Sequence, residues 1–184
     1  MNTVSYDVQY TESRNRLTTF FRGILSIPHM IVAGVWGYLA QLLAVIQWLI
    51  VLFTGKRNEG MWNMQNQWNG YSARVSAYYS LMYDPYPPFG NEVGNTGVSY
   101  SLAFEAEANR LTCGLRLLWA IPAMIIGIGV GIAGFVVTVA SWFAILFTGK
   151  HPKGMFDFLV KVQRFTVMLT AYTLLMTDTY PKYG

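Results

Sequence analysis

A glycine–lysine turn that occurs twice is the first feature whose residue types suggest chemistry. The string LFTGK stands at Leu52–Lys56 and again at Leu146–Lys150. A phosphate-binding loop has the form GxxxxGK[ST] between a strand and a helix. Both copies lack the earlier glycine and the hydroxyl residue after lysine, and each follows a long apolar run. We therefore expect no nucleotide site and interpret both copies as helix ends, with glycine left-handed and lysine at the negative end of the helix dipole.

The remaining chemically capable side chains do not form a metal or catalytic pattern. The histidines His29 and His151 are far apart in sequence, and Ala123 stands where the second half would repeat His29. Cys113 is the single cysteine, which excludes an internal disulfide. There is no HExxH motif, no cysteine pair and no carboxylate cluster. We expect no metal, no cofactor and no enzymatic activity.

Two arginine–aspartate pairs have a spacing that could bring them together. If the chain folds back at each LFTGK turn, the paths from Arg22 to the turn and back to Asp84 have similar lengths. The same holds for Arg116 and Asp178. We expect each pair to hold a helical hairpin closed at a membrane surface. The alternative is that each charged side chain extends separately into water.

Aromatic and basic side chains in the later part of each half are candidates for contact with lipid or a partner protein. Tryptophan and tyrosine concentrate at membrane interfaces, and a charged residue at membrane depth usually faces a charged or polar group. An apolar groove for a lipid or quinone is the alternative interpretation. The candidates are Trp62, Trp68, Tyr71, Arg74, Tyr78 and Arg164.

Composition and charge distribution indicate a membrane protein. The chain is 53% hydrophobic and 12% charged, against about 25% charged residues in soluble domains. No Asp, Glu, Lys or Arg occurs in the 33 residues 23–55 or in the 33 residues 117–149, and about 20 apolar residues suffice to cross a bilayer. The net charge of +4 favours anionic lipid headgroups rather than nucleic acid as the partner.

An internal duplication sets the domain organisation. Shifted by 94 residues, positions 4–90 align without a gap on 98–184, and 30 of the 87 pairs are identical. Repeats of this kind indicate two copies of one structural unit. We predict a first repeat at 1–90, a flexible linker at 91–97 and a second repeat at 98–184.

Each repeat is predicted to be a helical hairpin that follows a short extended arm. An apolar helix with Ile-Pro near its start ends at LFTGK, and a second helix follows at about 60–82 or 154–176, before a proline-containing tail. The predicted fold class is an all-α integral membrane protein made of two tandem helical-hairpin repeats.

The apolar helices are longer than a bilayer requires. A helix of 33 residues would measure about 50 Å against a hydrocarbon core of about 30 Å. We favour a single tilted helix whose ends protrude through the headgroups over a re-entrant hairpin bent at the glycines, because broken backbone hydrogen bonds need protein or water nearby. The pairs Ala33/Gly37 and Gly127/Gly131 have small-xxx-small spacing and are predicted to let helices approach closely.

The combined motifs resemble a family of small bacterial membrane proteins that is known only as a domain of unknown function. The resemblance covers both halves: the Ile-Pro apolar helix, the Phe-Thr-Gly-basic turn, the aromatic helix with Ala-Tyr, and the Asp-x-Tyr-Pro tail. Ala123, Met168 and Lys182 depart from the pattern of the first copy. The resemblance implies a hairpin-inserted or multi-pass protein of the bacterial cytoplasmic membrane, and it implies no activity.

The second helix of the first repeat carries the functional expectation. It is rich in Asn, Gln and Ser as well as aromatic residues, so it is too polar to face acyl chains. We expect a partner to cover it, which makes the protein a non-catalytic accessory or scaffold subunit of a larger membrane complex or self-oligomer. The alternative is a lipid-handling or small-molecule transport module framed by the duplicated halves. Membrane lipids are expected partners in either case.

Overall fold

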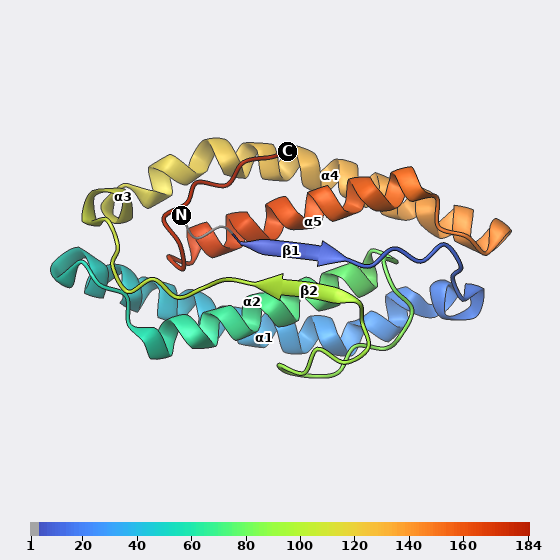
Figure 1. The fold of residues 1–184 in the computed structure, drawn as a ribbon, viewed down its shortest axis with the longest axis horizontal. Helices are drawn as coiled ribbons and strands as arrows, with labels where there is room; N and C mark the ends of the chain where they lie inside the picture. Colours follow the sequence, from blue (N-terminus) through green and yellow to red (C-terminus); the bar gives the residue numbers. More distant parts are fainter. Residues whose placement is uncertain (1–3) are drawn as a thin grey trace.

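The computed structural model describes residues 4–184, so the first three residues of the predicted repeat 1–90 lie outside the described part (Figure 1). Two long helices, α1 (Arg16–Thr54) and α4 (Arg116–Thr148), are each followed by a shorter one, α2 (Glu59–Tyr79) and α5 (Lys153–Thr173). The short helix α3 (Arg110–Gly114) precedes α4, and the strands β1 (Ser5–Val8) and β2 (Val98–Ser101) begin the two repeats. The protein is mostly helical, as predicted.

The LFTGK turns end the long helices, as the sequence indicated. Gly55 and Gly149 are left-handed, with φ of 73° and 74°. Their N–H groups donate to the carbonyls of Val51 and Ile145, which closes the last helical turn. Each LFTGK segment therefore separates the two helices of a hairpin.

Both long helices are continuous. α1 has 39 residues and α4 has 33, and each includes a proline near its start, Pro28 or Pro122. The re-entrant alternative is therefore wrong, because neither helix is interrupted at its glycines. Both helices are long and apolar enough to cross a membrane.

The two hairpins are antiparallel, and they are joined crosswise: the segment before the long helix of each repeat bonds to the LFTGK turn of the other repeat. β1 pairs antiparallel with β2, with Tyr6 opposite Tyr100. The amide of Arg14 donates to the carbonyl of Gly149, and the amide of Ala108 donates to the carbonyl of Gly55. Each LFTGK turn thus binds the segment that leads into the other repeat, and the two turns lie at opposite ends of the molecule.

The molecule has three layers. α1 packs on α2 and α4 packs on α5, while α2 and α5 also contact each other. The β1–β2 ribbon lies along the other side of α2 and α5, parallel to the long axis of the molecule (Figure 1). Tyr6 and Val8 point into the core, and Ser5 and Asp7 are exposed. The ribbon therefore gives the molecule a polar face opposite the long helices.

The second helices end three residues earlier than predicted. α2 stops at Tyr79, and Leu81 takes a left-handed conformation with φ of 64°. Leu175 does the same after α5, with φ of 63°. The amide of Met82 reaches back to the carbonyl of Ala77, which is the bonding pattern of a Schellman helix end. A leucine at such a position cannot be predicted from its type, because glycine is the usual residue there.

The polar side chains of α2 are satisfied within the chain. Gln65 is fully buried and donates to the carbonyl of Ala40 in α1. Asn69 donates to the hydroxyl of Tyr100, which in turn donates to Asn66. The polarity of this helix thus reflects its place in the middle layer, where it must bond to neighbours on both sides.

Candidate functional site

The first predicted ion pair is present at the carboxyl end of α2. An Nη2 of Arg22 lies 2.7 Å from Oδ1 of Asp84, and Nη1 donates to the carbonyl of Tyr83 at 2.5 Å. The guanidinium also lies 4.2 Å from the centre of the Tyr78 ring, a cation–π distance. Arg22 is 2% exposed, so this contact fixes α1 to the end of the hairpin.

The second predicted ion pair repeats the arrangement at the other end of the molecule. Arg116 pairs with Asp178, donates to the carbonyls of Tyr172 and Thr177, and lies 4.4 Å from the Tyr172 ring centre. Asp178 also binds Nη2 of Arg57 at 2.6 Å. Arg57 belongs to the first repeat, so this cluster joins both halves.

Each cluster contains one further arginine, and the two further arginines, Arg14 and Arg57, occupy different positions in the sequence of the first repeat. Arg14 donates from Nη2 to the carbonyl of Met82 at 2.6 Å and from Nε to that of Leu81. Arg57 donates from Nε to the carbonyl of Leu175 at 2.6 Å. These two arginines thus bind the carbonyls of the two left-handed leucines.

Arg14 and Arg57 are not among the predicted site residues, although a difference between the two repeats points to them. The position of Arg14 is Ala108 in the second repeat, and the position of Arg57 is His151. Because the hairpins are crossed, Arg14 and His151 meet at one end and Ala108 and Arg57 at the other. The two differences between the copies therefore compensate, leaving one additional arginine in each cluster.

The electrostatics of both clusters follow from burial beside helix ends. The carbonyls at the ends of α2 and α5 carry partial negative charge, which favours nearby guanidinium groups. Burial would raise the pKa of Asp178, but the Asn109 amide, Arg57 and Arg116 hold it below its usual value. Burial and the charge of Arg14 lower the pKa of His151 to about 4. His151 is therefore neutral at pH 7.

The clusters are suited to holding elements together. The arginines donate to carbonyls and carboxylates of the chain itself. Within residues 4–184 there is no group of three His, Cys, Asp or Glu side chains that could hold a metal ion. This geometry assigns the pairs a mechanical role in closing the hairpins.

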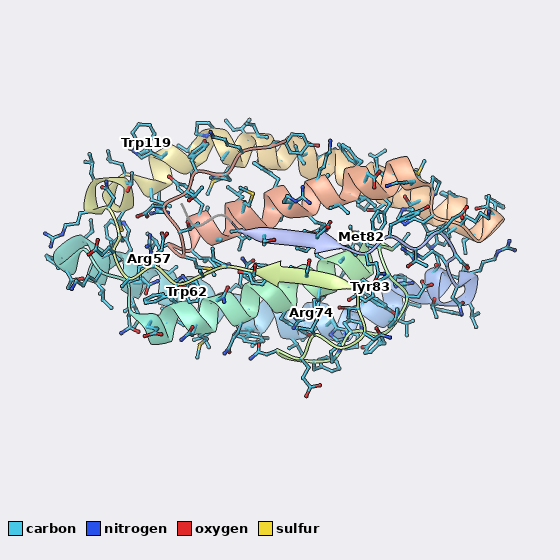
Figure 2. The ribbon with its side chains drawn as sticks, in the orientation of Figure 1. Arg57, Trp62, Arg74, Met82, Tyr83 and Trp119 are labelled. Atoms are coloured by element: carbon cyan, nitrogen blue, oxygen red, sulfur yellow. The ribbon has the colours of Figure 1, made fainter. Side chains whose placement is uncertain are left out.

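Four of the predicted lipid or partner contacts are buried within the chain. Trp62 is 3% exposed and donates from its indole to the carbonyl of Met176, between the hairpins (Figure 2). Arg74 donates to the carbonyl of Gly90, and Tyr71 and Tyr78 lie in the core. The prediction that these side chains contact lipid or a partner is wrong, because α1 and the segments after α2 and α5 cover them.

The other two candidates remain partly accessible. Trp68 is half-buried, and its indole donates to the carbonyl of Ala33 in α1. Arg164 donates to the carbonyl of Tyr6, and its Nη2 lies 3.6 Å from Oδ1 of Asp7 in the exposed ribbon. Arg164 therefore belongs to the polar face, whereas Trp68 lies beneath the long helices.

The predicted small-residue pairs serve packing within each hairpin rather than between the long helices. A side chain at Gly37 would lie 3.1 Å from Trp68, and one at Gly127 would lie 2.9 Å from Leu169. Gly131 has nothing within 4 Å of the position of a Cβ atom. At Gly134, which the prediction omitted, a Cβ atom would lie 2.9 Å from Val162.

The remaining functional surface is the uncovered face of α1 and α4. Of the 40 large apolar side chains that are exposed among residues 4–184, 31 lie on these two helices. They include Trp119, which points outward from the edge of the molecule (Figure 2). α5 contributes none of them. Such a large apolar surface on a small protein marks contact with a membrane or another protein.

Comparison with known proteins gives one match. The family model described as a domain of unknown function (DUF4389) matches residues 16–90 and 110–183. The two matched regions coincide with the two hairpins and agree with the tandem duplication. No curated protein and no solved structure matches the chain.

Proposed function

Since the chain belongs to the family described as a domain of unknown function (DUF4389), with two copies of the domain, we propose its function from its geometry: it is a non-catalytic, lipid-binding membrane protein. In this proposal α1 and α4 lie flat in one leaflet, and α2, α5 and the ribbon lie on its aqueous side. The observation that carries the proposal is the concentration of exposed apolar side chains on the α1/α4 face.

The polar face formed by the β1–β2 ribbon favours an orientation in which α1 and α4 lie parallel to the membrane rather than across it. All layers share one long axis (Figure 1), so a crossing molecule would carry the ribbon through the bilayer. Asp7 and Arg164 would then meet hydrocarbon, at a cost of about 3 kcal/mol for each charged side chain. A helix at the interface instead buries its apolar face by about 5–10 Å and leaves its polar side wet.

The accessory role remains a second candidate, with a different surface from the one first expected. The polar face of α2 is covered by the chain itself and calls for no partner. On α4, however, Gly129 and Gly131 have open space around them. Small residues of this kind let a second membrane helix approach closely, so a partner helix could cover α4 in place of lipid.

Depth measurements along α1 test the flat orientation. Nitroxide labels are placed one at a time at Leu17, Ile24, Ile31, Tyr38 and Val45, seven residues apart on the exposed side, after replacing Cys113 with serine. In lipid vesicles, accessibility to oxygen and to a water-soluble nickel complex gives the depth of each label. We expect similar depths at all five positions.

A crossing helix would give a different result. Successive labels would differ in position by about 10 Å along the helix axis, so depth would pass through a maximum at the bilayer centre. That profile would refute the flat orientation. A label at the exposed Ser5 of the ribbon serves as the control and should remain accessible to the nickel complex. Co-isolation of a stoichiometric membrane protein from the native source, without lipid contact at α4, would favour the accessory role.

A further inference from the structure

A groove runs along α1 on the apolar face and is bordered by α4 at both of its ends. Four adjoining hollows, each of about 300 to 390 Å³, follow one another along α1. The two outer hollows are also lined by α4, and the two middle ones are lined by α1 with α2 and α5. Consecutive hollows share Tyr79, Trp68 and Thr173 from the underlying helices, so they form one channel with a floor made by α2 and α5. The groove extends from Arg22 to Trp48, which corresponds to about 39 Å of helix.

Both ends of the groove are closed by equivalent tryptophans. The indole of Trp142 in α4 donates to the carbonyl of Thr19 in α1 at 3.0 Å. The indole of Trp48 in α1 donates to the carbonyl of Cys113 at 3.0 Å. The first bond joins α1 to α4 and the second joins α1 to α3, so both lie at the ends of the groove and leave its middle open.

The interior of the groove offers little to a polar ligand. Two of the hydroxyls on its walls are already bonded within the chain: Thr138 donates to the carbonyl of Gly134, and Thr173 donates to that of Thr170. Ser76 accepts a bond from the amide of Gln163. Apart from Gln41, Ser72 and Thr170, the exposed walls are mostly aliphatic and aromatic, so a hydrocarbon chain fits them best.

An exposed arginine lies just beyond each end. Arg16 and Arg110 are the first residues of α1 and α3, where a cation is unfavourable for its own helix. Their Nε atoms reach toward Gly149 and Gly55, within 3.2 Å and 3.0 Å of where a Cβ atom would stand. Neither arginine forms an ion pair with a carboxylate of residues 4–184. Both guanidinium groups are thus placed to meet an anionic group at the groove end.

We propose that the groove binds phospholipid, with an acyl chain along α1 and the phosphate at Arg16 or Arg110. This inference rests on the proposed lipid-facing function. One leaflet accounts for about 15 Å of a hydrocarbon core of about 30 Å, so a groove of about 39 Å has room for two chains end to end. The pseudo-twofold arrangement of the repeats places one phospholipid at each end.

Native mass spectrometry of the full chain tests this proposal. The protein is reconstituted with an equal mixture of phosphatidylglycerol and phosphatidylcholine, and then released from a mild detergent. We expect up to two phospholipids to remain bound. Gly34 lines the groove with open space around it, so Gly34→Phe should fill the groove and remove most of the retained lipid.

Two matched controls make the result specific. Gly129 also has open space but lies on the outer side of α4, so Gly129→Phe should retain lipid like the original chain. The double variant Arg16→Gln/Arg110→Gln should lower the preference for phosphatidylglycerol by about fivefold at each site, since one cation near a headgroup contributes about 1 kcal/mol. Lys161→Gln, on the exposed side of α5, should not change it.

The outcomes separate this inference from the function on which it rests. Equal lipid loss in Gly34→Phe and Gly129→Phe, or no retained lipid in the original chain, would overturn the groove assignment. If the labels on α1 still report a uniform depth, the flat orientation stands and only the groove assignment fails. If the labels report no contact with the bilayer, both fail together.

Discussion

At the scale of single residues, two buried arginines stabilise the molecule by closing helix ends rather than by forming surface ion pairs. Arg22 and Arg116 are each 2% exposed and donate to backbone carbonyls as well as to a carboxylate. Removing one partner of such a pair leaves an uncompensated buried charge, which costs more than an exposed pair contributes.

The Asp178→Asn substitution tests this contribution. It leaves Arg57 and Arg116 without their shared carboxylate. We expect the free energy of unfolding to fall by about 2–4 kcal/mol, slightly below the usual value for a fully buried pair because Asp178 is partly exposed. Denaturant titration in detergent micelles measures it. Asp157→Asn, which removes an exposed pair with Lys153, should change stability by less than about 0.5 kcal/mol.

His151 gives the molecule a pH dependence of known sign. Burial and Arg14 lower its pKa to about 4 in the folded protein, from 6.5 when unfolded. Between these values the unfolded chain binds the proton and the folded chain does not, so stability falls as the pH falls. We expect a loss of up to about 3 kcal/mol from pH 7 to pH 4.

Comparison with His151→Gln isolates this effect. The variant should lose distinctly less stability over the same range, measured by thermal or denaturant unfolding at pH 7, 5.5 and 4. Asp178 acts in the same direction but in a different window, because its pKa is already lowered and its stabilisation disappears only in stronger acid. Identical slopes for His151→Gln and the original chain would contradict the assignment.

The residue contacts differ in how far the sequence could predict them. The Arg22–Asp84 and Arg116–Asp178 pairs follow from the similar lengths of the two chain paths that lead from each pair to the LFTGK turn. Arg57 could not be found in that way, since its acceptor at Leu175 lies 118 residues further along the chain. The only sequence signal for Arg57 is that Arg14 and Arg57 are replaced by Ala108 and His151 in the second repeat. That difference can be interpreted only when the crosswise contact between the repeats is known.

At the scale of elements, the glycines of α4 differ in function according to the side they face. Gly134 is in tight contact with Val162 of α5, whereas Gly131 is open. Both sit at small-residue spacings within one apolar helix, so the sequence pattern could not separate them. The predicted close packing is found at Gly37 and Gly127 but not at Gly131, and the partners are the shorter helices of the same hairpin.

Substituting leucine at these positions tests the distinction. Gly134→Leu should push α4 away from α5 and lower the free energy of unfolding by about 1–3 kcal/mol, the usual cost of overpacking. Gly131→Leu should be neutral or stabilising by up to about 1 kcal/mol, because glycine is a poor helix former. Chemical denaturation in micelles compares them. Similar destabilisation by both would show that Gly131 also packs closely.

At the scale of the whole molecule, the crossed arrangement explains why the duplicated repeats differ where they do. A pair of first repeats would bring Arg14, Arg22 and Arg57 around one Asp84 at each end. A pair of second repeats would leave Arg116 alone with Asp178, since Ala108 and His151 supply no further guanidinium at pH 7. The covalent pair of unlike repeats places two arginines in each cluster: Arg57 and Arg116 both pair with Asp178, whereas Arg22 pairs with Asp84 and Arg14 binds the neighbouring carbonyls.

Separate expression of the halves tests this specificity. Residues 1–94 and 95–184, produced as two chains with different tags, should assemble as a one-to-one pair in micelles. Like charges around Asp84 disfavour a pair of first halves. Size-exclusion chromatography and pull-down through either tag measure the composition. Stable pairs of identical halves, formed as readily as mixed ones, would contradict the charge argument.

The overall arrangement was the part that sequence patterns could least predict. Periodicity and charge gaps located the hairpins, and the duplication located the repeats. The crosswise joining depends on main-chain bonds such as that from Arg14 to Gly149, which any residue type can form. The sequence therefore predicts the polar second helix as a surface for a partner, whereas α1 and the other half of the same chain cover it.

The crosswise joining also sets the moment during synthesis at which the molecule can be completed. Arg57 is made with the first hairpin, but Leu175 and Asp178 follow it by 118 and 121 residues. At about 5–20 residues per second, the nascent chain waits about 6 to 24 s for them. During this interval the first hairpin exposes to its surroundings the side of α2 that α5 later covers. Any chaperone or insertion factor that assists this protein therefore meets a surface that the finished molecule no longer displays.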